Sequence, residues 1–147
     1  MTTDVVHRDI MKAAALGDSE TANQLYGQLT VEGRESYNIF VIAMFAGAMG
    51  VRFKDDQSLE AIRRFAAEMQ YDYRDAEPPV KQLTVELVIR AMMGEEHLFE
   101  EISGEEQLRI QLLSIRKVVD QSEQMKARLD DHLTDAEALA AQWVGGE

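Results

Sequence analysis

The chain has 147 residues, with 27 acidic and 15 basic side chains, a net charge of −12 and no cysteine. This length fits one domain that buries a core without cross-links, and the lack of cysteine excludes disulfides, thiolate metal sites and thiol catalysis. Nucleic acids and anionic membrane surfaces are disfavoured as partners, because binding them relies on Lys and Arg to neutralise phosphates. The first residues lack the basic start and apolar segment of a secretory signal, so we expect a cytoplasmic protein.

The composition predicts an all-α fold. Only two prolines occur, at positions 78 and 79, and Ala, Leu, Glu, Met and Gln dominate elsewhere without an alternating strand pattern. We therefore expect a single-domain bundle of about six to seven helices over residues 1–147. The first helix should cover 4–16 and end at Gly17, which enters the left-handed conformation without a Cβ clash. Asp18 should cap a second helix that ends near residue 29.

The most apolar segment is YNIFVIAMFAGAMG, residues 37–50, which carries no charge between Glu35 and Arg52. A helix over the uncharged residues 36–51 is about 24 Å long, whereas a bilayer core of about 30 Å requires about 20 residues. We therefore predict a central helix of the bundle over about 35–53, and no membrane span.

Small residues form one strip of this central helix: Ala43, Ala46, Gly47 and Gly50. At 100° per residue they project to one narrow sector, with bulky side chains on the rest of the circumference. Two glycines inside a helix destabilise it by about 1 kcal/mol each relative to alanine. We expect close approach of another helix or of a second subunit along this small-residue strip to compensate.

The middle of the chain contains the best candidate linker, residues 74–79, with sequence RDAEPP. Pro79 suits the first position of a helix, and Pro78 cannot belong to a helix before it. The linker should separate an amphipathic helix over 58–73 from another over 80–93. It is also the point at which the domain could be subdivided.

The segment 95–106, EEHLFEEISGEE, carries six carboxylates and one histidine. Hard cations favour clustered oxygen ligands, but helical spacing spreads Glu95, Glu96, Glu100 and Glu101 around the axis. The Glu-x-x-His pairs of a di-metal bundle are also missing, since Asp4, Gly94 and Leu129 precede the three histidines by three residues. We expect a solvated acidic face, with no metal and no cofactor.

A long C-terminal helix is predicted over about 104–133. Ser103 and Glu106 have the spacing of a capping box at its start. Its apolar positions follow a 4, 3, 4 spacing at Leu108, Leu112, Ile115 and Val119, and the seam weakens at Ser122 and Lys126. Such a seam fits a partner helix of the bundle or a two-stranded interface. Thr134 and Glu137 repeat the capping box and predict a last helix over 134–143.

No catalytic motif accompanies these elements: G-x-S-x-G, G-x-x-x-x-G-K-[ST], G-x-G-x-x-G and H-E-x-x-H are all missing. We therefore expect a non-enzymatic helical protein–protein interaction or regulatory module that forms a homodimer or binds another protein. One alternative is a small-molecule-binding bundle with a cavity beside Tyr37 and Asn38. Another is an acidic decoy or immunity-type protein that neutralises a basic partner.

Overall fold

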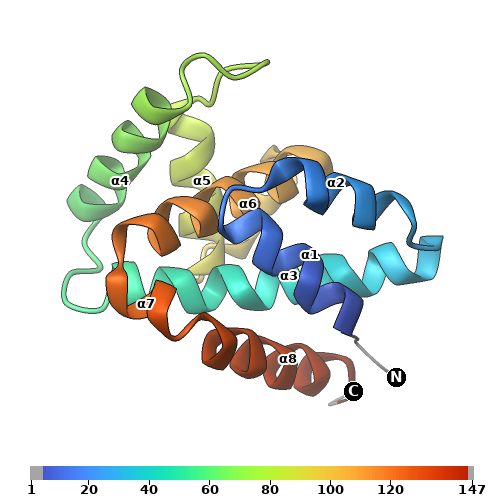
Figure 1. Ribbon diagram of the computed structural model, residues 1–147. Helices are drawn as coiled ribbons and strands as arrows, with labels where there is room; N and C mark the ends of the chain where they lie inside the picture. Colours follow the sequence, from blue (N-terminus) through green and yellow to red (C-terminus); the bar gives the residue numbers. More distant parts are fainter. Residues whose placement is uncertain (1–4, 146–147) are drawn as a thin grey trace.

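The computed structural model describes residues 5–145, and their regular secondary structure is entirely helical (Figure 1). Asp4, the expected first residue of the first helix, lies outside this range. The elements are α1 (Val5–Ala15), α2 (Ser19–Gly27), α3 (Val31–Arg52), α4 (Leu59–Asp72), α5 (Gln82–Met92), the 3-10 helix η1 (Glu96–Glu101), α6 (Gly104–Gln121), α7 (Glu123–Ala127) and α8 (Leu129–Gly145). The predicted all-α class is confirmed.

The central helix is α3, as the apolar segment 37–50 predicts. It crosses the middle of the molecule, with α6 and α8 packed along it, α1 and α2 towards one end and α4 and α5 towards the other (Figure 1). Eight of its side chains are buried: Tyr37, Phe40, Val41, Ala43, Met44, Phe45, Ala48 and Met49. Within the described residues no helix, α3 included, is both long and apolar enough to cross a membrane.

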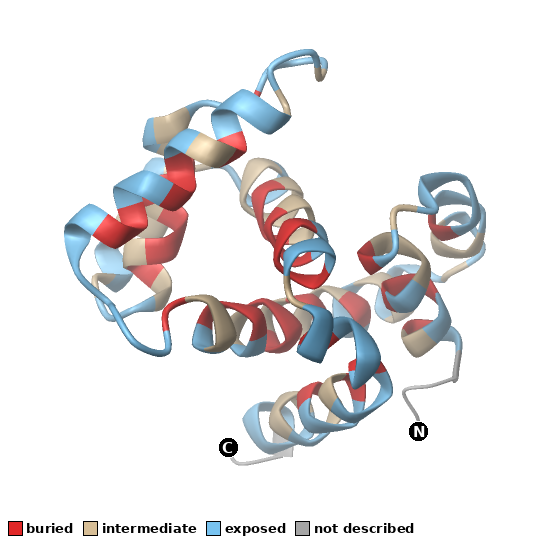
Figure 2. Ribbon diagram, turned by 60° about the vertical axis from the view of Figure 1, so that its left-hand side comes forward, coloured by how far each residue is buried: buried red, intermediate tan, exposed pale blue. Residues whose placement is uncertain are grey.

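One hydrophobic core unites the two sides of the linker. Its buried residues run from Ile10 on α1 to Ala136 on α8, and the buried sides of α3, α4, α5 and α6 face inward (Figure 2). The linker itself is the loop between α4 and α5, which pack against each other. Arg109 on α6 donates to the Pro78 carbonyl and ties the loop to the bundle. The chain is therefore a single domain.

Side-chain caps fix the starts of several helices. Asp18 and Thr30 accept hydrogen bonds from the backbone N–H groups three residues on, at 3.3 and 3.0 Å. Ser103 does the same for Glu106 at 3.1 Å, which confirms the predicted start of the C-terminal helix. The Glu106 carboxylate, however, accepts from Arg109 at 3.3 Å. Each cap satisfies a backbone donor that the first turn leaves free.

The long C-terminal helix is present, but it ends at Gln121 and not near residue 133. Ser122 adopts an extended conformation, with φ −104° and ψ 106°, and its hydroxyl accepts from the Met125 N–H at 3.1 Å. Ser122 therefore closes α6 and caps α7, because a serine side chain competes with the helical backbone for its donors. The weak point of the seam at Ser122 marks this break.

The second predicted capping box, at Thr134, is wrong because α8 runs through it without interruption. Thr134 donates to the Asp130 carbonyl at 3.1 Å, one turn back along the helix. Glu137 instead accepts from Arg8 at 2.7 Å, and Arg8 also donates to the Thr134 hydroxyl. Both side chains are therefore used to fasten α1 to α8, a contact that local sequence does not encode.

Candidate functional site

The small-residue strip of α3 is only partly covered by the chain. Ala43 is buried and Ala46 half-buried, whereas Gly47 and Gly50 are exposed. A Cβ atom built on either glycine meets no atom within 4 Å apart from its own helix backbone and chain neighbours. The expected close approach of a helix from the same chain is therefore not made at these two glycines. Ile39 and Ile42, on the same helix, are half-buried.

The seam of α6 is used inside the chain. Ile115 and Val119 are fully buried in the core, and the half-buried Leu108 and Leu112 pack against it. The helix packs extensively against α3. The seam was predicted to pack within the bundle or to form a two-stranded interface. In the structure it packs within the bundle.

The acidic segment 95–106 forms η1 and the start of α6. Glu96, Glu100 and Glu101 are exposed, and Glu95 turns back to Arg90 on α5. Within the described part of the chain, no group of three or more His, Asp or Glu residues is placed to hold a metal ion. The segment therefore presents carboxylates to solvent without bringing them together.

We expect the Arg90–Glu95 ion pair to be detectable as a lowered pKa of Glu95 in a titration. Arg90 donates to both carboxylate oxygens of Glu95 at 2.8 Å, and these hydrogen bonds lower the pKa of Glu95, against a smaller opposing effect of desolvation. A lowered folded-state pKa stabilises the fold above the ordinary glutamate pKa, and this stabilisation is lost as pH falls through the lowered value. Carboxyl NMR of Arg90→Gln should show the Glu95 pKa rising, whereas Arg64→Gln should leave it in place. An unchanged Glu95 titration in Arg90→Gln would contradict this assignment.

A cavity was expected beside Tyr37 and Asn38, but aromatic side chains surround Tyr37 instead. Its ring packs against those of His7, Tyr26 and Phe40, with centroids 5.7 to 6.5 Å away. This burial raises the pKa of Tyr37 well above its ordinary value, with a smaller contribution from Tyr26. Tyr37 is thus a core residue. The Asn38 side-chain oxygen is buried and accepts no hydrogen bond.

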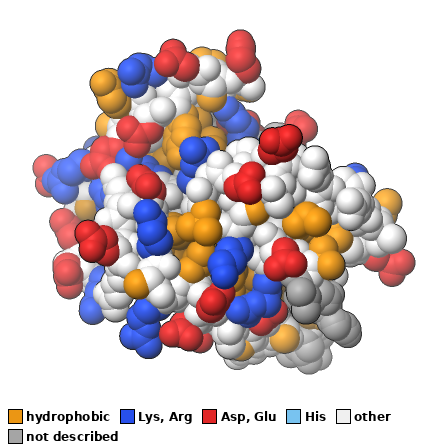
Figure 3. All heavy atoms as spheres, in the orientation of Figure 1, with side chains coloured by type: hydrophobic (Ala, Val, Ile, Leu, Met, Phe, Trp, Pro, Cys, Tyr) orange, Lys and Arg blue, Asp and Glu red, His pale blue; other side chains and the backbone are white. Residues whose placement is uncertain are grey.

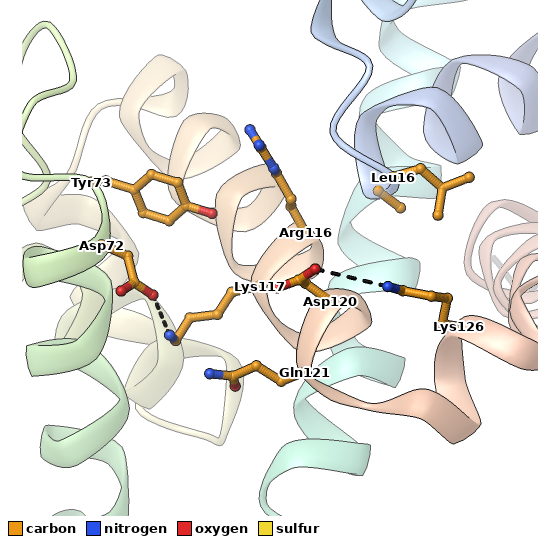
Figure 4. Close-up of a pocket in the computed structure, with 9 residues that line it drawn as sticks. Leu16, Asp72, Tyr73, Arg116, Lys117, Asp120, Gln121 and Lys126 are labelled. Atoms are coloured by element: carbon orange, nitrogen blue, oxygen red, sulfur yellow. Dashed lines mark hydrogen bonds and ion pairs between the residues drawn. The ribbon is translucent and has the colours of Figure 1, made fainter.

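A pocket of about 240 Å³ lies elsewhere, between the ends of α1 and α4 and the last turns of α6 and α7. We call it the α6 pocket, and Figure 4 shows the side chains that line it. They are Ala15, Leu16, Asp72, Tyr73, Arg116, Lys117, Asp120, Gln121 and Lys126. This volume leaves room for several water molecules. The pocket is therefore sized for a small ligand.

Lys117 forms one wall of the α6 pocket and is the most buried cation there. Its side chain is 5% exposed, yet its ammonium group contacts two carboxylates of α4, Asp72 directly and Glu68 at 3.5 Å. Glu68 also accepts from Arg52 on α3 at 3.2 Å. A buried ammonium needs such partners because burial removes its hydration. This network fixes α4 against α6 at the base of the pocket.

Arg116 lies on the opposite wall and has a different environment. Its guanidinium packs over the turn between α1 and α2, 3.2 Å from where a Cβ of Gly17 would stand. The arginines that form ion pairs within the described residues are Arg8, Arg52, Arg63, Arg90, Arg109 and Arg128. Arg116 is not among them. Arg116 is exposed to solvent, and its guanidinium has no carboxylate partner among the described residues.

Two further polar groups complete the pocket. Tyr73 directs its hydroxyl towards α6, where it donates to the Leu113 carbonyl at 3.4 Å, a long contact (Figure 4). Burial raises the pKa of Tyr73, and Arg116 opposes this effect. Lys126 reaches in from α7 and stands 3.8 Å from Asp120, in a pair whose two side chains are more than half exposed.

Sequence reasoning missed the α6 pocket, although one signal was present. The positions Ile110, Ser114, Lys117 and Gln121 follow the same 4, 3, 4 spacing as the seam, and the first three are buried. A lysine inside a buried helical stripe indicates an acidic partner across the interface. The sequence does not say which of 27 acids supplies it. That choice depends on how α4 packs on α6.

The surface around these features is mixed in charge. Acidic and basic side chains alternate over the face in Figure 3, and hydrophobic side chains emerge between them in small groups. Comparisons of the chain with protein-family models, with curated proteins and with solved structures find no match.

Proposed function

We propose that this protein is a non-enzymatic helical interaction module that forms a homodimer through the small-residue strip of α3. The observation that carries the proposal is the open surface over Gly47 and Gly50 in the last two turns of the central helix. Each glycine weakens the helix by about 1 kcal/mol relative to alanine, and packing within the described residues 5–145 supplies no contact at its Cβ position in return. A second copy of α3 would fit, because small residues let two helix backbones approach closely.

The test is the substitution Gly47→Leu. In sedimentation equilibrium, the wild-type protein should have twice the chain mass of 16.6 kDa, and Gly47→Leu should be monomeric because the leucine side chain fills the contact. The monomer should remain folded and gain roughly 0.5–1 kcal/mol of helix stability, since leucine is the better helix former. Gly27→Leu is the matched control: this exposed α2 glycine also has open space around its Cβ position, and the substitution should leave the dimer intact. A wild-type chain that is monomeric at every concentration would overturn the proposal.

A second candidate function is the binding of a small molecule in the α6 pocket. The observation that favours it is a cavity lined by polar and charged side chains from the end of α4, from α6 and from α7, with one buried lysine held in place by two carboxylates. Ligand sites typically combine such a preformed concave surface with a few fixed polar groups. The pocket and the α3 strip are lined by different residues, so both functions can reside in one chain.

A further inference from the structure

We propose that the α6 pocket binds a small anion, with a carboxylate or phosphate group as the recognised moiety. This inference rests on the second candidate function above and names its ligand class. Arg116 is the principal anion-binding residue and Lys126 the secondary one, and Tyr73 lines the cavity on the α4 side. Three features of the pocket support this assignment.

The first feature is the charge of the lining. Three cations, Arg116, Lys117 and Lys126, face two carboxylates, Asp72 and Asp120, so the lining is positive by one unit. The whole chain carries −12. A positively charged concavity on a negatively charged protein concentrates anions, because the surrounding wall excludes part of the screening solvent.

The second feature is which of these charges are already neutralised. Lys117 is held by Asp72 and Glu68, and Glu68 is itself shared with Arg52. Arg116 takes part in no ion pair among the described residues, and the contact of Lys126 with Asp120 is long and solvated. The unsatisfied charge therefore belongs to Arg116 and, in part, to Lys126. A cationic ligand would meet these two groups with repulsion.

The third feature is the geometry of the donors. Gly17 has φ +87°, and its lack of a Cβ lets the Arg116 guanidinium lie against the α1–α2 turn. In Figure 4, Arg116, the Tyr73 hydroxyl and Lys126 extend from three different helices around the cavity. A guanidinium presents two parallel N–H donors, which match the two oxygens of a carboxylate or phosphate. Such a constellation suits a compact anion better than a neutral molecule.

The test measures binding by the full chain in ¹H–¹⁵N NMR titrations at constant ionic strength. The probes are inorganic phosphate, acetate and succinate, with putrescine as the cationic and glycerol as the neutral comparison. We expect phosphate or a carboxylate to shift the Arg116 side-chain N–H signals and the backbone signals of Tyr73 and Lys126. Comparison of phosphate with the two carboxylates identifies which anion class the pocket prefers.

Three variants should change the affinity for the anion in different directions. Arg116→Gln should weaken anion binding at least tenfold, and Asp120→Asn should tighten it two- to threefold by releasing Lys126 from its competing carboxylate. Arg64→Gln removes an exposed arginine of α4 outside the pocket lining and should change nothing. A purely structural role for Asp120 predicts no gain, so the tightening is diagnostic even if another variant folds poorly.

Failure of the anion inference can be distinguished from failure of small-molecule binding as a whole. Binding of putrescine or glycerol in the pocket without binding of any anion would overturn the anion inference and leave small-molecule binding in place. Anion shifts that persist unchanged in Arg116→Gln would also overturn it. If no probe of any class perturbs the pocket signals, both the inference and the second candidate function are wrong.

Discussion

Phe45→Ala is expected to lower the free energy of unfolding by about 3–5 kcal/mol, the usual range for removing a buried phenylalanine ring. Phe45 is fully buried on α3, the helix against which both α6 and α8 pack. The truncation therefore leaves a cavity that no single neighbour can close. Urea unfolding followed by circular dichroism measures the loss as a lower midpoint at an unchanged m-value.

The matched control is Phe99→Ala in η1. Phe99 is half-buried and is not part of the core cluster, so its truncation should lower the free energy of unfolding by about 1 kcal/mol. Equal losses for the two variants would contradict a core centred on α3. They would mean that η1 contributes to stability as much as the central helix does.

In the charged network at the base of the α6 pocket, removing a carboxylate should lower the free energy of unfolding more than removing the buried lysine. Asp72→Asn leaves the buried Lys117 ammonium with one carboxylate, Glu68 at 3.5 Å, and we expect a loss of about 1–2 kcal/mol, reduced from the fully buried range because Asp72 is partly exposed. Lys117→Met removes the buried charge itself and keeps the apolar stem. The two carboxylates can then be hydrated, and Glu68 retains Arg52, so this loss should be below about 1 kcal/mol.

The control for this comparison is Asp131→Asn. Asp131 pairs with Arg128 at 3.3 Å on the surface, where both side chains are more than 60% exposed, so its removal should have no measurable effect. Thermal and urea unfolding at pH 7 and low salt provide the three values. A larger loss for Lys117→Met than for Asp72→Asn would show that attraction within the network outweighs the desolvation of Lys117.

Much of the secondary structure follows from local sequence because its causes are local. Ser58 caps α4 through its bond to the Ala61 N–H at 3.1 Å, as any serine in that place can, and Gly17 ends α1 because φ +87° suits glycine. The uncharged segment 37–50 was bound to supply much of the core, since a helix that is apolar on most sides is stabilised by burying them. Class, central helix and most helix boundaries were therefore predictable.

The same local rules fail where a side chain has more than one possible use. Thr134 and Glu137 have the spacing of a capping box, but Arg8, more than 120 residues earlier in the chain, binds both of them and the helix continues. The glycines of the α3 strip could have faced a helix of the same chain, and only the packing of α6 and α8 leaves them uncovered. Nothing in the spacing distinguishes these outcomes.

What the sequence alone determined is the class of the fold, its central helix and the caps at Asp18 and Ser103, because each of these depends on residues within one or two turns of each other. What only the tertiary structure decided is the α6 pocket. Tyr73 is far along the chain from Arg116 and Lys126, and its meeting with them depends on how α4 lies against α6. Packing decides which charged side chains form ion pairs. Among the described residues it leaves Arg116 without a carboxylate partner, and the sequence alone does not reveal this.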